Sequence, residues 1–309
     1  MQYHDYYMHK VLLFYVPPVL LVIGTVGNAL SLCVLVRRSM RRTSTYNYLA
    51  VLSVTDMLIL YVGLLRLWIG ELTGMEVRDM SDWGCKIITM AGYTVSVCSV
   101  WLLIAVTVER YIVTVHSLHA GTMCTRARAV KVIIAILLTL TLTNSHFLWT
   151  AELGVFEMED EENVTICTSS EGHEYLVEQV WPWVDAFFYC FSPFVIICIL
   201  NGLIVHKVIL SRQQRRLLSA STTANSTAAS SRNTSSQSES SVRVTIMLLT
   251  ISFTFLVCTL PMNAVMIKSA FLSYDTATIQ DIAQYKLART VSELLMYTNH
   301  SINFYLYLV

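Results

Sequence analysis

Asp56 lies in the middle of a long apolar segment, where an ionised side chain is costly unless the protein uses it. Polar side chains stand at a similar depth on other apolar segments: Asn28, Ser99, Asn299, Ser301 and Asn303. Oxygen ligands suit a hard cation, and a single carboxylate suits a small monovalent one. Asp56, Ser99, Asn299 and Asn303 therefore predict a sodium site, although a water-filled hydrogen-bond network could use the same residues.

Arg66 and Glu293 are two further charges, in the outer half of the segment that contains Asp56 and in the outer half of the last apolar segment. Because a buried unpaired charge is expensive, they either pair with each other or bind a ligand. The side chains that could line the same outer cavity are Tyr93, Asn263 and Tyr297, with Asn144 and His146 as further candidates. Aromatic walls with a few convergent polar groups are typical of a ligand site.

Glu109-Arg110-Tyr111 ends a further apolar segment, and we expect Arg110 to pair with Glu109 at the membrane edge. The pair is either a simple positive anchor or a switch that breaks to free Arg110 for a cytoplasmic partner. Pro193 and Pro261 interrupt two more segments, and each removes one helix hydrogen bond. Such kinks serve as hinges in a bundle that moves, or they remain static.

Motifs for enzymatic chemistry are absent from the sequence, which has no nucleophile elbow, HExxH, phosphate loop or CxxC pair. The scattered histidines lack metal-ligand spacing, and we interpret His300 as a satisfied polar group. The sequence therefore predicts a protein that is not an enzyme and does not bind nucleic acid.

Seven apolar segments must position these residues. With 55% hydrophobic and 14% charged residues, the 309-residue chain is far less charged than a soluble domain. Each segment reaches the roughly 20 residues that a membrane span needs, and spans of this kind are helices. The predicted spans one to seven are 10–36, 46–70, 83–115, 128–151, 179–210, 242–270 and 284–309. We expect an all-α, seven-transmembrane helix bundle that forms a single domain, residues 1–309.

Orientation follows from the basic residues, which gather in the turns after spans one, three and five. Positive residues favour the cytoplasmic side, so the N-terminus is outside and the C-terminus inside. No cleavable signal peptide is visible, and span one is expected to direct insertion. The chain stops at Val309, directly after span seven, which indicates either a fragment or a form without a cytoplasmic tail.

Of the eight cysteines, only Cys85 and Cys167 fall on the oxidising side, so one disulfide between them is the economical prediction. The outer loop at about 152–178 carries nine acids and no Lys or Arg, which is either a solvated loop or an electrostatic funnel for a cationic ligand. It also holds the glycosylation sequon at Asn163. The cytoplasmic loop at about 212–241 is rich in Ser and Thr and is predicted to be disordered.

Taken together, these residues resemble the class A (rhodopsin-like) G-protein-coupled receptors. The resemblance covers the whole chain: Gly27-Asn28, Asp56, Cys85, Glu109-Arg110-Tyr111, Pro193, Cys258-Thr259-Leu260-Pro261 and Asn303-Phe304-Tyr305-Leu306-Tyr307. It implies that Glu109, Arg110 and Tyr111 serve G-protein coupling. It also implies an activation switch built from Phe255, Pro261, Asn303 and Tyr307.

The chain departs from the family pattern at several positions. Thr259 stands where a tryptophan is usual, and Phe304 stands where a proline is usual. Span six has Ser240, Ser241 and Arg243 near the position of the family's inner lock, so a lock from Arg110 to span six is not expected.

The ligand class is narrowed by Gly92, which replaces the aspartate of amine receptors, and by Tyr297, which replaces the retinal lysine of opsins. The acidic outer loop and the cavity charges resemble peptide receptors, most nearly invertebrate neuropeptide receptors of the FMRFamide type. The resemblance implies a plasma-membrane receptor that responds to a neuropeptide and activates a heterotrimeric G protein, with arrestin as a further partner and membrane lipids around it. The alternatives are a chemosensory receptor for a small molecule and, from another class, a transporter or channel.

Overall fold

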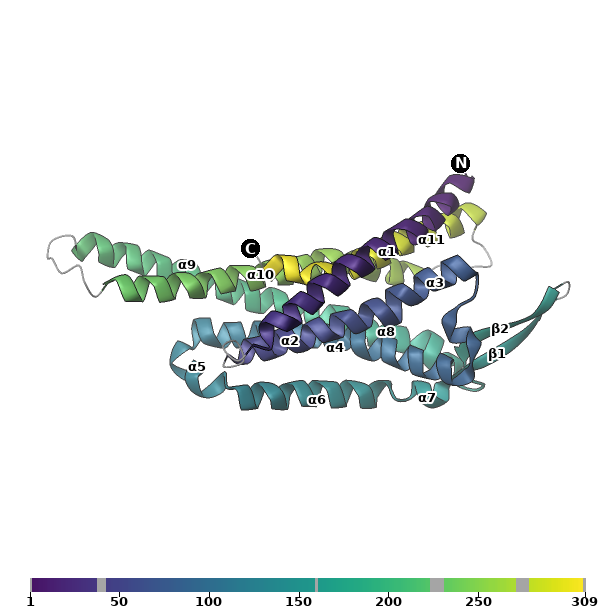
Figure 1. Cartoon of the computed structure of the whole chain (residues 1–309), viewed down its shortest axis with the longest axis horizontal. Helices are drawn as coiled ribbons and strands as arrows, with labels where there is room; N and C mark the ends of the chain where they lie inside the picture. Colours follow the sequence, from purple (N-terminus) through teal and green to yellow (C-terminus); the bar gives the residue numbers. More distant parts are fainter. Residues whose placement is uncertain (1, 38–42, 159–160, 223–230, 271–277, 308–309) are drawn as a thin grey trace.

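The computed structural model describes residues 2–37, 43–158, 161–222, 231–270 and 278–307, although some side chains within these ranges lie outside the description. Helices dominate the fold, and seven helical stretches run along the long axis of the molecule (Figure 1). In chain order they are α1 (Gln2–Leu35); α2 (Ser44–Ile59) with η1 (Leu60–Leu65) and α3 (Arg66–Thr73); α4 (Asp82–Val115); α6 (Arg126–Asn144) with α7 (Phe147–Thr150); η3 (Tyr175–Val180) with α8 (Trp181–Ala186), η4 (Phe187–Phe191) and α9 (Ser192–Thr222); α10 (Ser231–Ala270); and α11 (Ile279–Tyr307). Two short helices lie in the connections, η2 (Val77–Met80) and α5 (Ser117–Met123).

The seven stretches match the seven predicted spans. Within the described residues, five are long and apolar enough to cross a membrane, and α10 contributes a shorter apolar part at Leu249–Val265. Helix α11 is continuous, but charged residues that include Arg289 and Glu293 interrupt its apolar sequence. In Figure 1 the N-terminus lies towards one end of the bundle, whereas α5 and the facing ends of α9 and α10 lie at the other. This arrangement agrees with the predicted orientation.

The outer loop contains a β-hairpin that the sequence analysis missed. Strand β1 (Ala151–Met158) pairs antiparallel with β2 (Glu161–Ser169), and Leu153 lies opposite Cys167. The signal was present, because Val155, Phe156, Val164 and Ile166 belong to residue types that favour strands. The nine acids of the loop masked that signal.

The Ser/Thr-rich inner segment, which was predicted to be disordered, is helical where the structure describes it. Helix α9 continues to Thr222 and α10 begins at Ser231, while residues 223–230 lie outside the described part of the chain. A membrane helix that already exists can extend into the cytoplasm without a new nucleation step, which is the unfavourable part of helix formation.

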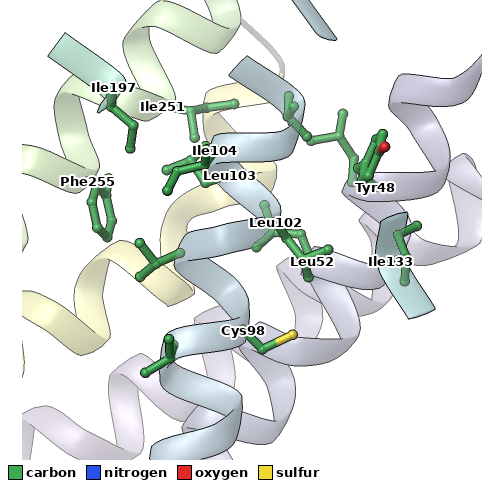
Figure 2. Close-up of a cluster of buried hydrophobic side chains, with 14 of the residues drawn as sticks. Tyr48, Leu52, Cys98, Leu102, Leu103, Ile104, Ile133, Ile197, Ile251 and Phe255 are labelled. Atoms are coloured by element: carbon green, nitrogen blue, oxygen red, sulfur yellow. The ribbon is translucent and has the colours of Figure 1, made fainter. Parts of the chain in front are cut away.

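The apolar core lies between spans two to six. Its buried side chains include Leu52, Leu102, Ile133, Ile197 and Phe255 (Figure 2). This core lies between the outer and the cytoplasmic ends of the bundle.

Proline has different local effects in the two kinked spans. The π-helical turn η4 comes directly before Ser192-Pro193, where the missing N–H of proline removes one helix hydrogen bond. Helix α10 continues through Pro261 without a change of helix type. A hinge role for either proline stays a prediction.

Candidate ligand cavity and the polar centre beneath it

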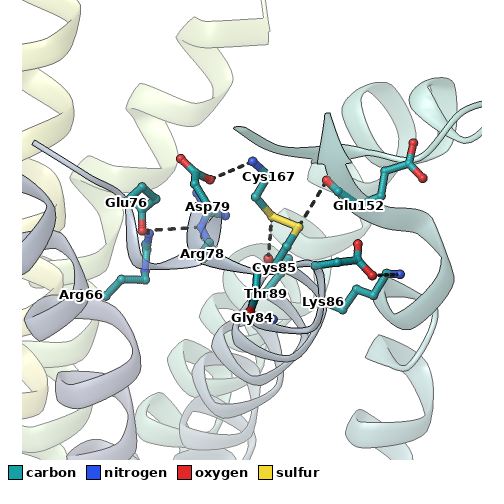
Figure 3. The surroundings of a disulfide bond; sticks show 12 residues. Arg66, Glu76, Arg78, Asp79, Gly84, Cys85, Lys86, Thr89, Glu152 and Cys167 are labelled. Carbon is teal, nitrogen blue, oxygen red and sulfur yellow. Dashed lines mark hydrogen bonds and ion pairs between the residues drawn. A yellow bond between two sulfur atoms is a disulfide. The ribbon is translucent and has the colours of Figure 1, made fainter. Parts of the chain in front are cut away.

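The outer end of the bundle is fixed by the predicted disulfide, which the structure forms between Cys85 and Cys167 (Figure 3). Cys85 lies in the first turn of α4, and Cys167 lies in β2. The backbone N–H of Cys167 also donates to Asp79 Oδ1 at 2.8 Å. The hairpin is therefore tied both to span three and to the connection that contains η2.

Arg66 and Glu293, which were expected to meet each other or a ligand, each pair with a different residue. Arg66 binds Glu76, and the same carboxylate lies 3.8 Å from Arg78 Nε (Figure 3). Glu293 accepts a hydrogen bond from Arg289 Nε at 2.9 Å, one turn away on α11. Neither Glu76 nor Arg289 was predicted as a partner from the sequence. Glu76 lies in a loop, and Arg289 lies near the end of an apolar run.

A cavity of about 290 Å³ opens between spans two, three, five, six and seven. Arg66, Tyr93, Asn263 and Tyr297 line it, so the structure brings together four of the five residues predicted to bind a ligand. Glu293 is not part of this lining, but its partner Arg289 is. The remaining polar lining is Arg78, Asp185, Tyr189, Thr89 and Ser96. Asp185 was missed, although an acid in an apolar run is the same signal that drew attention to Asp56.

A second cavity of about 350 Å³ lies beside the first, between spans three, four and five. Its wall is mostly apolar and includes Trp101, Trp181 and Phe188. Asn144, which was named as a further candidate for the outer cavity, lines this second cavity rather than the first. His146 packs its ring against Trp181 at 4.0 Å between ring centroids.

Close approach of spans two and seven depends on Gly63 in η1. A Cβ atom at this position would lie 2.5 Å from Tyr297 Oη, so no larger side chain fits without moving Tyr297. We expect Gly63→Ala to reduce the free energy of unfolding by about 1 to 3 kcal/mol, the usual penalty of overpacking. Thermal unfolding of the purified protein measures this effect.

Gly202→Ala is the matched control, because a Cβ at Gly202 meets no atom within 4 Å. Alanine is the better helix former, so this control should leave the unfolding midpoint unchanged or raise it slightly. Equal effects of the two substitutions would contradict the close approach at Gly63.

Asp56 lies at the centre of a buried polar cluster below the cavity. Its Oδ1 accepts from Ser99 Oγ at 3.0 Å and from His300 Nδ1 at 2.8 Å, and its Oδ2 accepts from Asn303 Nδ2 at 2.5 Å. Asp56 and His300 are 0% and 1% exposed, so this is a fully buried carboxylate–imidazole pair. When Asp56 is ionised its carboxylate only accepts hydrogen bonds, and Nδ1 of His300 is then the donor.

A sodium ion at this centre stays a prediction, and it would have to compete with His300 for the Asp56 carboxylate. Two of the predicted ligands, Ser99 and Asn303, contact Asp56, and Asn299 Oδ1 is buried without a hydrogen-bond partner among the described residues, so this oxygen remains available to a cation. His300 donates to the carboxylate that the ion would need. The prediction that His300 is a satisfied polar group holds for Nδ1 but not for Nε2, which is buried without a partner among the described atoms.

Residues 27–307, nearly the whole chain, match the family described as 7 transmembrane receptor (rhodopsin family). The chain belongs to this family. It is therefore a multi-pass membrane protein of a receptor family, and the family is not one of enzymes.

Similarity to individual receptors of the rhodopsin family is more distant. The chain is 38% identical to human neuromedin-U receptor 1 over 115 residues, which are 37% of the chain and 27% of that receptor. It is 25% identical to a probable G-protein coupled receptor, B0563.6, from Caenorhabditis elegans, over 95% of the chain and 65% of the relative. The galanin-like G-protein coupled receptor npr-9 from the same organism is also 25% identical, over 94% of the chain and 68% of the relative. The chain thus spans from about a quarter to about two thirds of the length of these relatives.

At the inner end of this rhodopsin-family bundle, Glu109 and Arg110 do not form the expected direct ion pair within the described part of the chain. Both bind Thr45 instead: its Oγ1 donates to Glu109 Oε1 at 2.5 Å and accepts from Arg110 Nη2 at 2.8 Å. The side chains of neighbouring residues on a helix point about 100° apart, so Glu109 and Arg110 do not face each other. Thr45 on span two lies between them and contacts both side chains. Tyr111 packs against His116.

The remaining predicted residues occupy the expected elements. Phe255 belongs to the core, and Thr259 donates to the Phe255 carbonyl at 2.7 Å. Helix α11 runs unbroken through Phe304 and ends at Tyr307, whose side chain lies outside the described residues. The side chains of Asn163, Ser240, Ser241 and Arg243 lie outside them as well. Their predicted roles in glycosylation and in the absent inner lock stay predictions.

Proposed function

We propose that this chain is a plasma-membrane receptor for an extracellular peptide and that it activates a heterotrimeric G protein. The observation that carries the proposal is the outer cavity of about 290 Å³, where Arg66, Tyr93, Asn263 and Tyr297 come together below the hairpin. Aromatic walls with convergent polar groups suit a ligand of mixed character. Relatives named as receptors for neuromedin U, together with a galanin-like receptor, support a neuropeptide as the ligand.

Activation would follow from differential binding. The peptide must bind the open arrangement of the spans more tightly than the closed one, since otherwise it shifts no equilibrium. An outward movement of span six at Pro261, with Phe255 in the core below, would then uncover Arg110 for the G protein. Phosphorylation of the Ser/Thr-rich inner segment would recruit arrestin.

The test is a calcium or cAMP response in cells that express the chain at their surface. The panel contains amidated peptides, neuromedin U and galanin among them, and RFamide peptides because the resemblance to FMRFamide-type receptors stays a prediction. A saturable response to one peptide supports the proposal. Silence towards peptides with a response to small volatiles or amino acids would favour a chemosensory receptor, which the mostly apolar second cavity would suit.

Thr45 provides a test of the inner switch. In the structure Thr45 binds both Glu109 and Arg110, and Ser44 adds a hydrogen bond to Glu109 at 2.6 Å. We expect Thr45→Ala to release Arg110 and to raise ligand-independent signalling several-fold. A charge-assisted hydrogen bond contributes about 1.5 to 3 kcal/mol, which is enough to shift a population by tenfold or more.

Basal G-protein signalling, normalised to surface expression, measures the effect. Thr45→Ser keeps the hydroxyl and serves as the matched control, and its basal signal should equal that of the unmodified chain. Basal signalling that is equally low in Thr45→Ala would contradict the role of Thr45 in holding Arg110.

A further inference from the structure

The outer end of span five carries three side chains with polar groups at intervals of four residues: Trp181, Asp185 and Tyr189. Nε1 of Trp181 and Oη of Tyr189 are buried without a hydrogen-bond partner among the described residues. The Asp185 carboxylate likewise has no hydrogen bond or ion pair with any residue that the structure describes. Buried polar groups in native proteins are almost always paired, so two unpaired ones beside a carboxylate that has no partner need an explanation.

The local backbone sets this row apart. Helix α8, which holds Asp185, lies between the π-helical segments η3 and η4. Wider turns of this kind are uncommon, and they occur frequently at functional sites because they change which side chains face inward. Here they accompany a spacing of four residues that directs Trp181, Asp185 and Tyr189 towards cavities instead of towards lipid alone.

Asp185 lines both cavities of the outer bundle. It shares the first with Tyr189, Arg66, Tyr297 and Asn263, and the second with Trp181 and the aromatic wall. A group bound to its carboxylate would therefore stand at the boundary between a polar space and an apolar one.

The charges around the first cavity leave Asp185 as the free carboxylate within the described residues. Glu76 is shared by Arg66 and Arg78, and Glu293 is held by Arg289. The guanidinium groups of these three arginines are paired with only two carboxylates, those of Glu76 and Glu293. Asp185 is the third carboxylate, so the positive and negative charges are equal in number. A cationic group of a ligand would therefore find Asp185 as its partner, whereas the arginines remain available to carbonyl oxygens of the ligand.

We propose that Asp185 binds a cationic group of the ligand, with the Tyr189 hydroxyl and the Trp181 indole N–H donating to carbonyl oxygens beside it. This inference rests on the proposed function for the idea that the ligand is a peptide, and it assigns a basic residue of that peptide to span five. Glu293, which was expected to meet Arg66 or a ligand, is the less available carboxylate, because Arg289 already holds it.

The rival use of Asp185 is structural. When the bundle closes, the carboxylate could form a salt bridge with Arg289, whose side chain is 53% exposed and lines the same cavity. A structural role requires no ligand, so a binding measurement separates the two.

The experiment uses the purified full chain and two probes, Nα-acetyl-arginine amide and Nα-acetyl-citrulline amide. They differ only in that a neutral urea group replaces the guanidinium. Each probe is titrated while the thermal unfolding midpoint is followed, because a ligand that binds the folded state raises it. We expect the arginine amide to act at a concentration at least tenfold lower than the citrulline amide.

The same titration in Asp185→Asn should show no preference between the probes, and Asp185→Glu should keep a reduced preference. Asp82→Asn is the matched control, since it removes an outer carboxylate that binds Lys86 away from both cavities. The proposal is overturned by equal action of the two probes on the unmodified chain, or by a preference that persists in Asp185→Asn. A lower unfolding midpoint of Asp185→Asn without probes, together with no preference in the unmodified chain, would identify the structural salt bridge.

This test does not depend on signalling. A failed peptide panel would remove the proposed function while leaving the preference for the guanidinium intact. Conversely, a successful panel with equal action of the two probes would keep the receptor function and remove Asp185 from it.

Discussion

Replacing His300 with alanine should destabilise the protein by about 3 kcal/mol, because it leaves the buried Asp56 carboxylate without one of its hydrogen-bond donors. The imidazole is one of three donors that hold the Asp56 carboxylate, and both residues are fully buried. The carbonyl of His300 accepts from Asn28 Nδ2 at 2.9 Å, and alanine keeps that backbone contact. The substitution therefore removes only the side chain, and thermal unfolding in sodium-free buffer should show a fall of roughly 10 °C.

Two further variants separate the charge from the packing. In Asp56→Asn/His300→Ala the uncompensated carboxylate is gone, so the double variant should recover more than half of the lost stability. Ser99→Ala removes one hydrogen bond to Asp56 and should cost about 1 kcal/mol. If His300→Ala unfolds at the same temperature as the unmodified chain, the pair does not stabilise this centre.

Sodium provides an independent check on the same cluster. With His300 in place, raising NaCl should change the unfolding midpoint no more than choline chloride at equal ionic strength. In His300→Ala the carboxylate is open to a cation, and NaCl should restore part of the stability. Specific stabilisation of the unmodified chain by sodium would show that the ion binds despite the imidazole.

The sequence was most informative where a single residue type has few structural uses. The seven spans and the pairing of Cys85 with Cys167 follow from hydropathy and from the side of the membrane, and the structure contains both. The outer cavity was also predictable in part, because Arg66, Tyr93, Asn263 and Tyr297 are polar or aromatic groups at similar depth on spans that must pack together.

Partners were harder to predict than positions. Arg66 binds Glu76 because a loop folds back over span two, and loop paths have no periodic signal. Glu109 and Arg110 meet at Thr45 because of how spans two and three pack, and a hydroxyl on an apolar helix does not stand out in a sequence. His300 and Asp185 did carry a signal, an ionisable group within a membrane span, and it was given too little weight.

Loss of the disulfide should have an effect of similar size at the outer end. The bond closes a sequence separation of 82 residues, and the loop-entropy relation assigns about 4 to 5 kcal/mol to a loop of that length. The membrane restricts the unfolded chain as well, so the effect in lipid should be smaller than this value. Cys85→Ser, Cys167→Ser and the double variant lose the same bond and should unfold at similar, lower temperatures.

Functional loss should exceed the loss of stability, because the disulfide also organises the cavity. The backbone N–H of Cys167 donates to Asp79, which belongs to η2 (Figure 3). The same short helix holds Arg78 near Glu76, the carboxylate that binds Arg66. Without the bond, β2 can leave span three, and this chain of contacts at the cavity rim loses its anchor. The preference for arginine amide over citrulline amide should therefore fall at temperatures where the variants are still folded.

Cys198→Ser is the matched control, since Cys198 is an exposed free cysteine on span five. It should leave both the unfolding midpoint and probe binding unchanged. Mild reduction of the unmodified chain should reproduce the behaviour of Cys167→Ser, because both leave every other side chain in place. If Cys167→Ser unfolds earlier but keeps full probe binding, the hairpin stabilises the bundle without shaping the cavity, and the contacts from Asp79 to Arg66 do not depend on it.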